Sequence, residues 1–276
     1  MQISFWSMLI RSRSAMLGLT IVLFMLMVAI VGPLLTENVR ISSRTFQPPL
    51  GEAFFGTDNL GRNVLSQMTR GAGVSLTVGL TAALISAAIG VITGALAGFR
   101  GGIVDEILMR VAEAFQVIPQ FFLAILIVAL FGPSLFKIII VIAILSWPST
   151  ARITRAEFLK LKSLDFVKAA QLSGASTPRL IFVEILPNAL PPVIVNTSLL
   201  VASSILTETS LSFLGLGDPN RVSWGQMLHN AQPFLRSAWW TAAFPGLAIL
   251  FTVLGFNLLG DGLNDVFNPR NRGAVN

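Results

Sequence analysis

The chain has 276 residues, of which 54% are hydrophobic and only 12% are charged, and it contains no cysteine. Soluble domains carry about 25% charged residues, and a soluble fold with this composition would expose large apolar patches. The composition therefore excludes an ordinary soluble protein, and the absence of cysteine excludes disulfides and thiolate metal sites. The net charge of +6 does not indicate nucleic-acid binding, because the basic residues lie between apolar segments instead of forming a patch.

Six apolar segments follow one another along the chain and predict an all-α polytopic membrane protein with six transmembrane helices. The first is too long for the hydrophobic region of a signal peptide, so we expect it to be a retained membrane helix. The second is rich in glycine and alanine, which favour close helix packing. Pro119 interrupts the third, and the fourth is expected to continue past Pro148. The predicted segments are 15–35, 74–99, 107–131, 135–147 with an extension to about 153, 191–216 and 239–259.

The segment 57–70 lies between the first two predicted spans and has a helical pattern of its own. Leu60, Val64 and Met68 fall on one face at helical spacing, and Thr57 or Asp58 can cap the start of such a helix. The pattern predicts an amphipathic helix lying in the outer membrane interface.

Lysine and arginine are unevenly distributed between the two sides of the predicted topology. With the N-terminus inside, twelve of the 19 basic residues lie on the inner side and seven on the outer side, and six of the twelve lie in the segment 149–187. The positive-inside rule therefore predicts that both termini and this segment are cytoplasmic. The predicted organisation is an N-terminal part (1–72), a five-helix core (73–262) with a cytoplasmic loop at about 149–187, and a cytoplasmic tail (263–276).

The cytoplasmic loop contains a helix–glycine–helix pattern. Ser163 or Asp165 is predicted to cap a short helix that starts near Phe166. Gly174 suits the left-handed residue that ends such a helix.

A second helix is predicted directly after this glycine. Ser176 or Thr177 is its predicted cap, and Pro178 lies in its first turn, where a missing N–H costs nothing. Ala169 and Ala170 give the first helix a low profile that a groove of another protein can approach closely. The residues alone leave two interpretations open, a docking element for a soluble partner and a basic loop that binds anionic lipid headgroups.

These residues also resemble a known motif. Lys168-Ala169-Ala170, Gly174 and the later Ile185-Leu186-Pro187 are similar to the "EAA" motif of inner-membrane permease subunits of binding-protein-dependent ABC importers. Lys168 stands where that motif has its glutamate.

Further blocks resemble the dipeptide, oligopeptide and nickel branch of the same family. They begin with Phe55-Gly56-Thr57-Asp58, and Asn63 replaces the usual aspartate a few residues later. The other similar blocks are 211–217, 223–225, 244–246 and 256–263. In the right order, they extend the resemblance from about residue 46 to about residue 270.

The resemblance implies a type I ABC importer permease in a prokaryotic inner membrane. It implies a homologous permease that completes a heterodimer, two ATP-binding subunits, and a periplasmic solute-binding protein that delivers small peptides or a related solute. The short cytoplasmic helix is then the element that couples the ATP-binding subunits to the membrane helices. The residues assigned to this coupling are Lys168, Ala169, Ala170, Gly174, Ala175, Ser176 and Pro178.

The sequence contains no sign of its own catalytic machinery. A phosphate-binding P-loop needs a lysine directly after glycine, and each of the four lysines follows another residue type. A zinc site built from histidines is excluded, because His229 is the only histidine. We therefore predict a transport subunit without a metal or cofactor, with ATP hydrolysis in other chains.

Glu208 is an acidic residue within the fifth apolar segment, where a carboxylate is costly and usually faces a polar interior. One interpretation places it on a translocation path or at the seam between two permeases, with Asn196 and Ser204 adding polarity. An alternative is a stand-alone secondary transporter that uses Glu208 as its proton site. A third places Glu208 nearer the membrane surface. An intramembrane hydrolase is a more distant possibility, because His229 lies outside the predicted helices.

Overall fold

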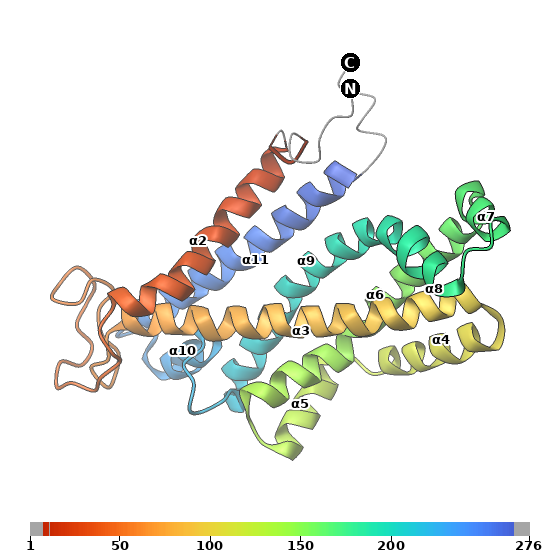
Figure 1. Cartoon of the computed structure of the whole chain (residues 1–276). Helices are drawn as coiled ribbons and strands as arrows, with labels where there is room; N and C mark the ends of the chain where they lie inside the picture. Colours follow the sequence, from red (N-terminus) through yellow and green to blue (C-terminus); the bar gives the residue numbers. More distant parts are fainter. Residues whose placement is uncertain (1–7, 11, 268–276) are drawn as a thin grey trace.

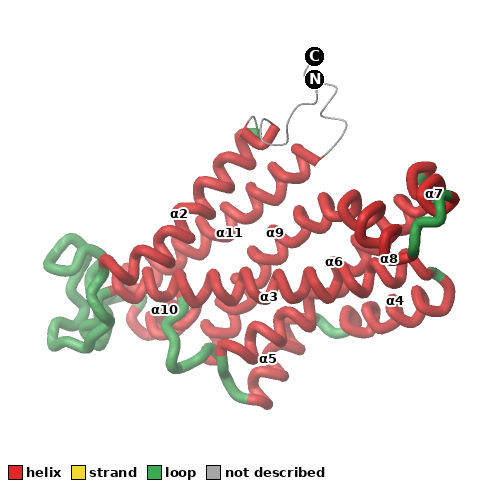
Figure 2. The backbone as a smooth tube through the Cα atoms, in the orientation of Figure 1, coloured by secondary structure: helices red, strands yellow, loops and turns green. Residues whose placement is uncertain are grey.

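The computed structural model describes residues 8–10 and 12–267, and these residues form helices joined by loops (Figures 1 and 2). The helices are α2 (Arg13–Leu35), α3 (Val64–Arg100), α4 (Gly102–Val117), α5 (Gln120–Phe131), α6 (Leu135–Lys162), α7 (Asp165–Leu172), α8 (Thr177–Arg179), α9 (Leu186–Leu211), α10 (Trp224–Ala231) and α11 (Trp240–Phe267). Shorter turns are η1 (Leu180–Ile185), η2 (Ser212–Leu216) and η3 (Gln232–Phe234). The described residues form no strand, so the predicted all-α fold is confirmed.

Five of the six predicted membrane segments are continuous helices that are long and apolar enough to cross a bilayer. The remaining one is broken, because α4 and α5 meet at an angle of 79° at the break that contains Pro119. A proline removes a backbone donor and disfavours helical geometry in the residue before it, which explains the break. Pro148 lies inside α6, which continues much further than predicted, to Lys162.

The predicted amphipathic helix over 57–70 is wrong. The chain forms a turn up to Asn63, and Val64 begins α3, which runs for 37 residues. The cap is Asn63 instead of Thr57 or Asp58, because its Oδ1 accepts hydrogen bonds from the backbone N–H groups of Leu65 and Ser66. The apolar face of residues 64–68 therefore belongs to a membrane-spanning helix.

Glycine and alanine bring the helices of the bundle into close contact, as the composition of the second segment predicts. Gly90, Gly94 and Gly98 line the side of α3 that faces α6, and a Cβ atom on Gly94 would overlap the carbonyl oxygen of Ala151. In the same way, α2 packs against α11, where the backbone at Gly18 lies against that at Gly255. Figure 1 shows these two pairs of neighbouring helices.

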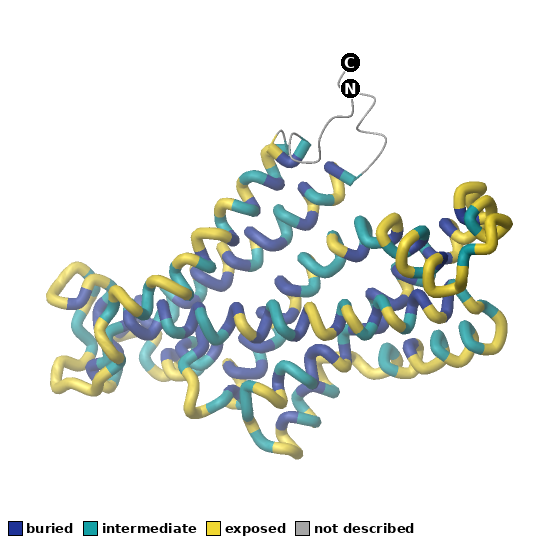
Figure 3. Tube along the Cα trace, in the orientation of Figure 1, coloured by how far each residue is buried: buried dark blue, intermediate teal, exposed yellow. Residues whose placement is uncertain are grey.

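The two ends of α3 lie at opposite ends of the molecule. The loop 36–63 and α10 are found at one end, and α7 with the α3–α4 turn at the other (Figure 1). In Figure 3 both ends carry many exposed residues, whereas the middle of α3 is mostly buried or half-buried.

The C-terminal helix α11 extends to Phe267, into the predicted tail. The rest of that tail, 268–276, lies outside the described residues, as do Arg11, Arg270 and Arg272, which the topology prediction counts as inner.

Candidate functional site

The short cytoplasmic helix predicted from the sequence is present as α7, with eight residues or about two turns. Its start differs from the prediction. Leu164 is the N-cap and its side chain accepts no capping hydrogen bond, so neither Ser163 nor Asp165 caps the helix. Ser163 instead donates its hydroxyl to the carbonyl of Lys160 at the end of α6. Asp165 lies in the first turn, where its negative charge is favourable at the positive end of the helix dipole.

The end of α7 forms a Schellman motif centred on Gly174, which confirms the predicted left-handed residue. Gly174 has a φ of 79°, and its N–H donates to the carbonyl of Gln171 at 3.1 Å. The N–H of Ala175 donates to the carbonyl of Ala170, also at 3.1 Å. Open space surrounds the position of a Cβ on Gly174, so backbone conformation, and not lack of room, requires glycine here.

One face of α7 is fixed to the rest of the protein. Val167 is only 2% exposed and packs in a cluster with Phe158 of α6 and with Leu180 and Ile185 of η1. Ala170 and Ala175 are half-buried against the same cluster, on either side of the Schellman turn. This apolar anchor holds α7 between the end of α6 and the start of the α8–α9 segment.

The opposite face of α7 is bare. Leu172 is 90% exposed and Phe166 is 42% exposed, although both are apolar. Lys168 and Ala169 are also exposed, and the Lys168 ammonium lies 3.6 Å from the carboxylate of Asp165 in the same helix. The exposed surface of α7 therefore combines Ala169, Leu172 and Phe166 with the exposed ion pair of Asp165 and Lys168.

The chain returns to the membrane through α8. Ser176 is the N-cap of α8, but its side chain makes no capping bond. Pro178 lies in the first turn, as predicted. The segment from Thr177 through α9 to Leu216 is long and apolar enough to be one membrane span. The helix α7 is therefore connected to two membrane helices, to α6 before it and to α9 after it.

A further contact links α4 to the end of α6 that leads into α7. The guanidinium of Arg155 pairs with both carboxylate oxygens of Asp105, and its terminal nitrogen lies 2.6 Å from Oδ2. Paired, two-point contacts of this kind fix relative orientation as well as distance. The α3–α4 turn, in which Gly101 and Gly102 both have positive φ, is thereby held against α6.

Glu208 lies inside the bundle and is 1% exposed. Its carboxylate accepts a 2.7 Å hydrogen bond from the hydroxyl of Ser212 and a 3.3 Å bond from that of Ser75 on α3. The Ser75 oxygen in turn accepts the backbone N–H of Trp224 at 3.3 Å. Glu208 therefore joins α9, α3 and the start of α10, and this contact explains how a carboxylate is accommodated there.

The other two residues predicted for a translocation path are also partly or fully enclosed. The Asn196 amide donates to the Thr150 hydroxyl of α6 at 3.0 Å. Ser204 is 1% exposed, and its hydroxyl has no hydrogen-bond partner among the described residues. Asn196 and Ser204 are not bonded to Glu208, and a path role for the three residues stays a prediction.

Sequence reasoning missed a polar row on the outward face of α9. Ser203, Thr207 and Ser210 lie at least partly exposed at helical spacing, and each hydroxyl donates to a carbonyl of its own helix. Ser203, Thr207 and Ser210 are four and three positions apart, so they share one face of the helix. The same spacing places the buried Ser204 and Glu208 together on another face.

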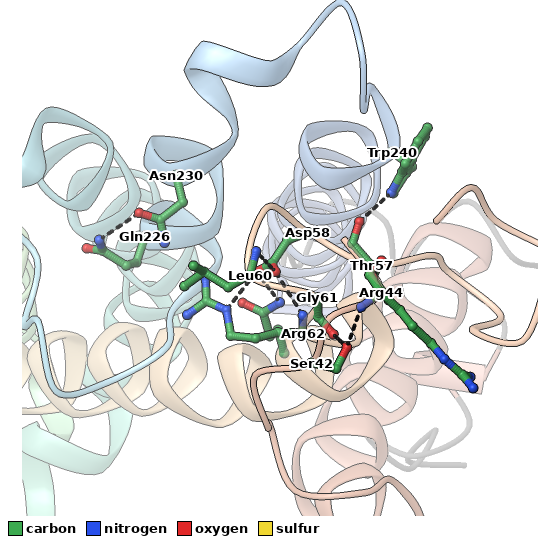
Figure 4. Close-up of polar contacts among 11 residues, drawn as sticks. Ser42, Arg44, Thr57, Asp58, Leu60, Gly61, Arg62, Gln226, Asn230 and Trp240 are labelled. Carbon is green, nitrogen blue, oxygen red and sulfur yellow. Dashed lines mark hydrogen bonds and ion pairs between the residues drawn. The ribbon is translucent and has the colours of Figure 1, made fainter. Parts of the chain in front are cut away.

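At the other end of the molecule, Asp58 organises the loop between α2 and α3 (Figure 4). Its Oδ1 accepts the backbone N–H groups of Leu60 and Arg62, both at 2.9 Å. Its Oδ2 accepts Arg62 Nε at 2.7 Å and Gln67 Nε2 at 3.0 Å. The loop is also fixed to α11, because Trp240 Nε1 donates to the carbonyl of Thr57 at 3.1 Å.

Comparison with known proteins gives consistent matches over nearly the whole chain. Residues 90–273 match the family described as "binding-protein-dependent transport system inner membrane component". Residues 3–49 match the "N-terminal TM domain of oligopeptide transport permease C".

Curated relatives are similar along almost their full length. The dipeptide transport system permease protein DppC of Bacillus subtilis is 41% identical over 97% of this chain and 85% of its own. The protein of the same name from Escherichia coli is 40% identical over 96% and 92%, respectively. The oligopeptide transport system permease protein OppC of Bacillus subtilis is 39% identical over 98% and 91%.

A solved structure has the same fold. A chain of the MetNI methionine ABC transporter, crystallised in an inward-facing conformation, superposes with a TM-score of 0.60 over 73% of this chain and 97% of that chain, at 18% identity. The type I importer fold predicted from the sequence is confirmed, as is the predicted role of a permease subunit rather than an ATPase. The chain belongs to the family of inner-membrane components of binding-protein-dependent transport systems.

Proposed function

We propose that this permease imports small peptides or a related solute together with a homologous permease, two ATP-binding subunits and a periplasmic solute-binding protein. The names of the relatives, dipeptide and oligopeptide permeases, support the substrate class. The bare face of α7 is the observation that carries the assignment of the ATP-binding partner.

The shape of α7 fits a coupling element. Leu172 and Phe166 project from a helix whose other side is anchored through Val167. Exposed apolar side chains on a helix whose opposite side is anchored are typical of a protein interface. A cleft that grips this face and closes on ATP moves α6 and α9 together, and so changes the side to which the membrane path opens.

The distribution of charge supports an orientation in which both termini and α7 are cytoplasmic. The six basic residues of 149–187 lie in α6, α7 and α8, and the positive-inside rule associates such an excess with the cytoplasmic side. Because the chain has no cysteine, single cysteines placed at Ser173 and at Asn220 can be labelled with a membrane-impermeant maleimide. The proposal expects labelling of Asn220→Cys in intact cells, and labelling of Ser173→Cys only after the membrane is opened.

The competing function is a stand-alone secondary transporter with Glu208 as its proton site. Each oxygen of this carboxylate accepts a serine hydroxyl inside the bundle, an arrangement that a fixed structural contact explains. Our proposal therefore assigns the driving force to ATP.

Reconstitution separates the two functions. The complete complex in liposomes is expected to take up dipeptides only with internal ATP and the external binding protein, and the purified chain alone is expected to take up none. Uptake by the chain alone, driven by a proton gradient and abolished by Glu208→Gln, would establish the secondary transporter instead.

A further inference from the structure

An open hollow of about 480 Å³ lies at the outer end of the molecule, between the loop that Asp58 organises and the segment around α10. Figure 4 shows Gln226 and Asn230 of α10 on one side and the loop with Arg62 on the other. These two parts of the chain are far apart in sequence. The hollow therefore depends on the fold and is not visible in either segment alone.

The ionisable side chains that line the hollow are all basic. Arg62, Arg221 and His229 line it together with the side-chain amides of Gln226 and Asn230, and the described lining residues include no aspartate or glutamate. Such a set of donors is complementary to a carboxylate.

The nearby acids are already engaged. Asp58 pairs with Arg62 through the Nε atom of that arginine. The Asp218 carboxylate accepts the backbone N–H groups of Leu135 and Asn220. Arg221 is exposed and has no ion-pair partner within the described part of the chain. Its charge is therefore available at the hollow.

A smaller space of about 20 Å³, room for about one water molecule, shares Asn59, Gln67 and Met227 with the lining of the hollow. The hollow itself is open to the outside, so it can receive a side chain that stays attached to another protein.

We propose that the hollow receives an acidic side chain of the periplasmic solute-binding protein, with Arg221 as its main partner. This inference rests on the proposed function, since it specifies how the binding protein of that function docks. An interfacial carboxylate held by arginine orients the partner and speeds its association, and this effect weakens as salt is added.

Charge reversal provides the test, with a matched control on the same outer segment. Arg236 is exposed like Arg221 but does not line the hollow. The assembled transporter is placed in nanodiscs, and the Kd for its purified binding protein is measured at low and high salt. We expect Arg221→Glu to raise the Kd about tenfold or more at low salt, and Arg236→Glu to change it by about twofold or less. The two variants are expected to have the same melting temperature as the wild type.

A second measurement identifies the occupant. Acidic residues of the binding protein are replaced by lysine one at a time, and one such replacement is expected to restore the affinity for Arg221→Glu. Equal effects of Arg221→Glu and Arg236→Glu, or no effect of either, would overturn the docking inference while wild-type binding leaves the proposed function intact. Absence of any binding by the wild type would instead overturn the proposed function.

A third measurement tests whether the hollow binds the carboxylate of a free peptide instead. A cysteine at Asn59, which lines the hollow, is labelled in the presence of dialanine without the binding protein. We expect no protection. Protection by dialanine would show that the hollow holds the carboxylate of a free peptide, and would overturn the assignment to the binding protein.

Discussion

The two ends of the molecule are built on different physical principles. At the end that holds the loop before α3, one buried carboxylate, Asp58, accepts four hydrogen bonds and fixes a loop that has no regular secondary structure. At the opposite end, α7 is held by a small apolar cluster around Val167 and by backbone bonds at Gly174. The polar network around Asp58 fixes the shape of the loop. The apolar cluster and the glycine turn hold α7 from one side only, so its opposite face stays exposed.

The comparison predicts its largest effect for Asp58→Ala. The substitution leaves buried donors without an acceptor, and we expect it to destabilise the protein by about 3 kcal/mol. Thermal unfolding of the purified chain in detergent measures the loss. Glu52→Ala is the matched control, because the pair of Glu52 with Arg44 is exposed and contributes at most about 1 kcal/mol. Equal melting temperatures for the two variants would contradict a structural role for the Asp58 network.

Gly174→Val is expected to have the next largest effect. A β-branched residue in the left-handed conformation costs about 1–2 kcal/mol, which is enough to distort the turn without unfolding the bundle. The variant complex should assemble, but uptake and substrate-stimulated ATP hydrolysis should both fall about tenfold or more. Gly174→Asn is the control, because asparagine tolerates this conformation. A Gly174→Val complex with normal stimulated hydrolysis would show that the turn does not transmit the movement.

Leu172→Ser is expected to weaken the binding of the ATP-binding subunits without lowering the stability of the chain. Leu172 is 90% exposed, so its replacement should leave the melting temperature of the isolated chain unchanged. If the bare face of α7 is an interface, the affinity for the ATP-binding subunits should fall about tenfold, as for an apolar contact residue. The amount of ATP-binding subunit that co-purifies at increasing dilution measures this affinity. Unchanged co-purification would indicate that Leu172 faces only solvent or lipid headgroups.

Lys168→Glu is expected to have the smallest effect. The substitution removes an exposed contact with Asp165 that contributes at most about 0.5 kcal/mol, and it restores the residue type of the motif. We expect no measurable change in stability and at most about a twofold change in uptake. A large loss of uptake would mean that the lysine contacts a partner directly, and its acidic neighbour on the ATP-binding subunit should then be sought.

The same comparison explains which features could be predicted from sequence. Residues that act through local backbone geometry were recognisable, and the turn at Gly174 and the position of Pro178 are found as expected. The helix start at Val64 was mispredicted, because Asp58 organises the preceding turn through tertiary contacts that override the local helical pattern. Of the two serines that bond Glu208, Ser212 is local in sequence, whereas Ser75 lies on another helix and carries no sequence signal of its own. The outer hollow needs two distant segments, and no single-segment pattern can reveal it.

The uninterrupted course of α3 has a mechanical consequence. The helix carries the Asn63 cap at one end and the turn at Gly101 at the other, and its 37 residues correspond to a rod of about 55 Å. A bilayer core is only about 30 Å thick, so the rod protrudes or leans, and it contains no proline at which to bend. The helix α9 packs against α3 near Ser75 and Gly79, and α6 packs against it from Gly90 to Gly98. A tilt of such a straight helix would move its two ends in opposite directions.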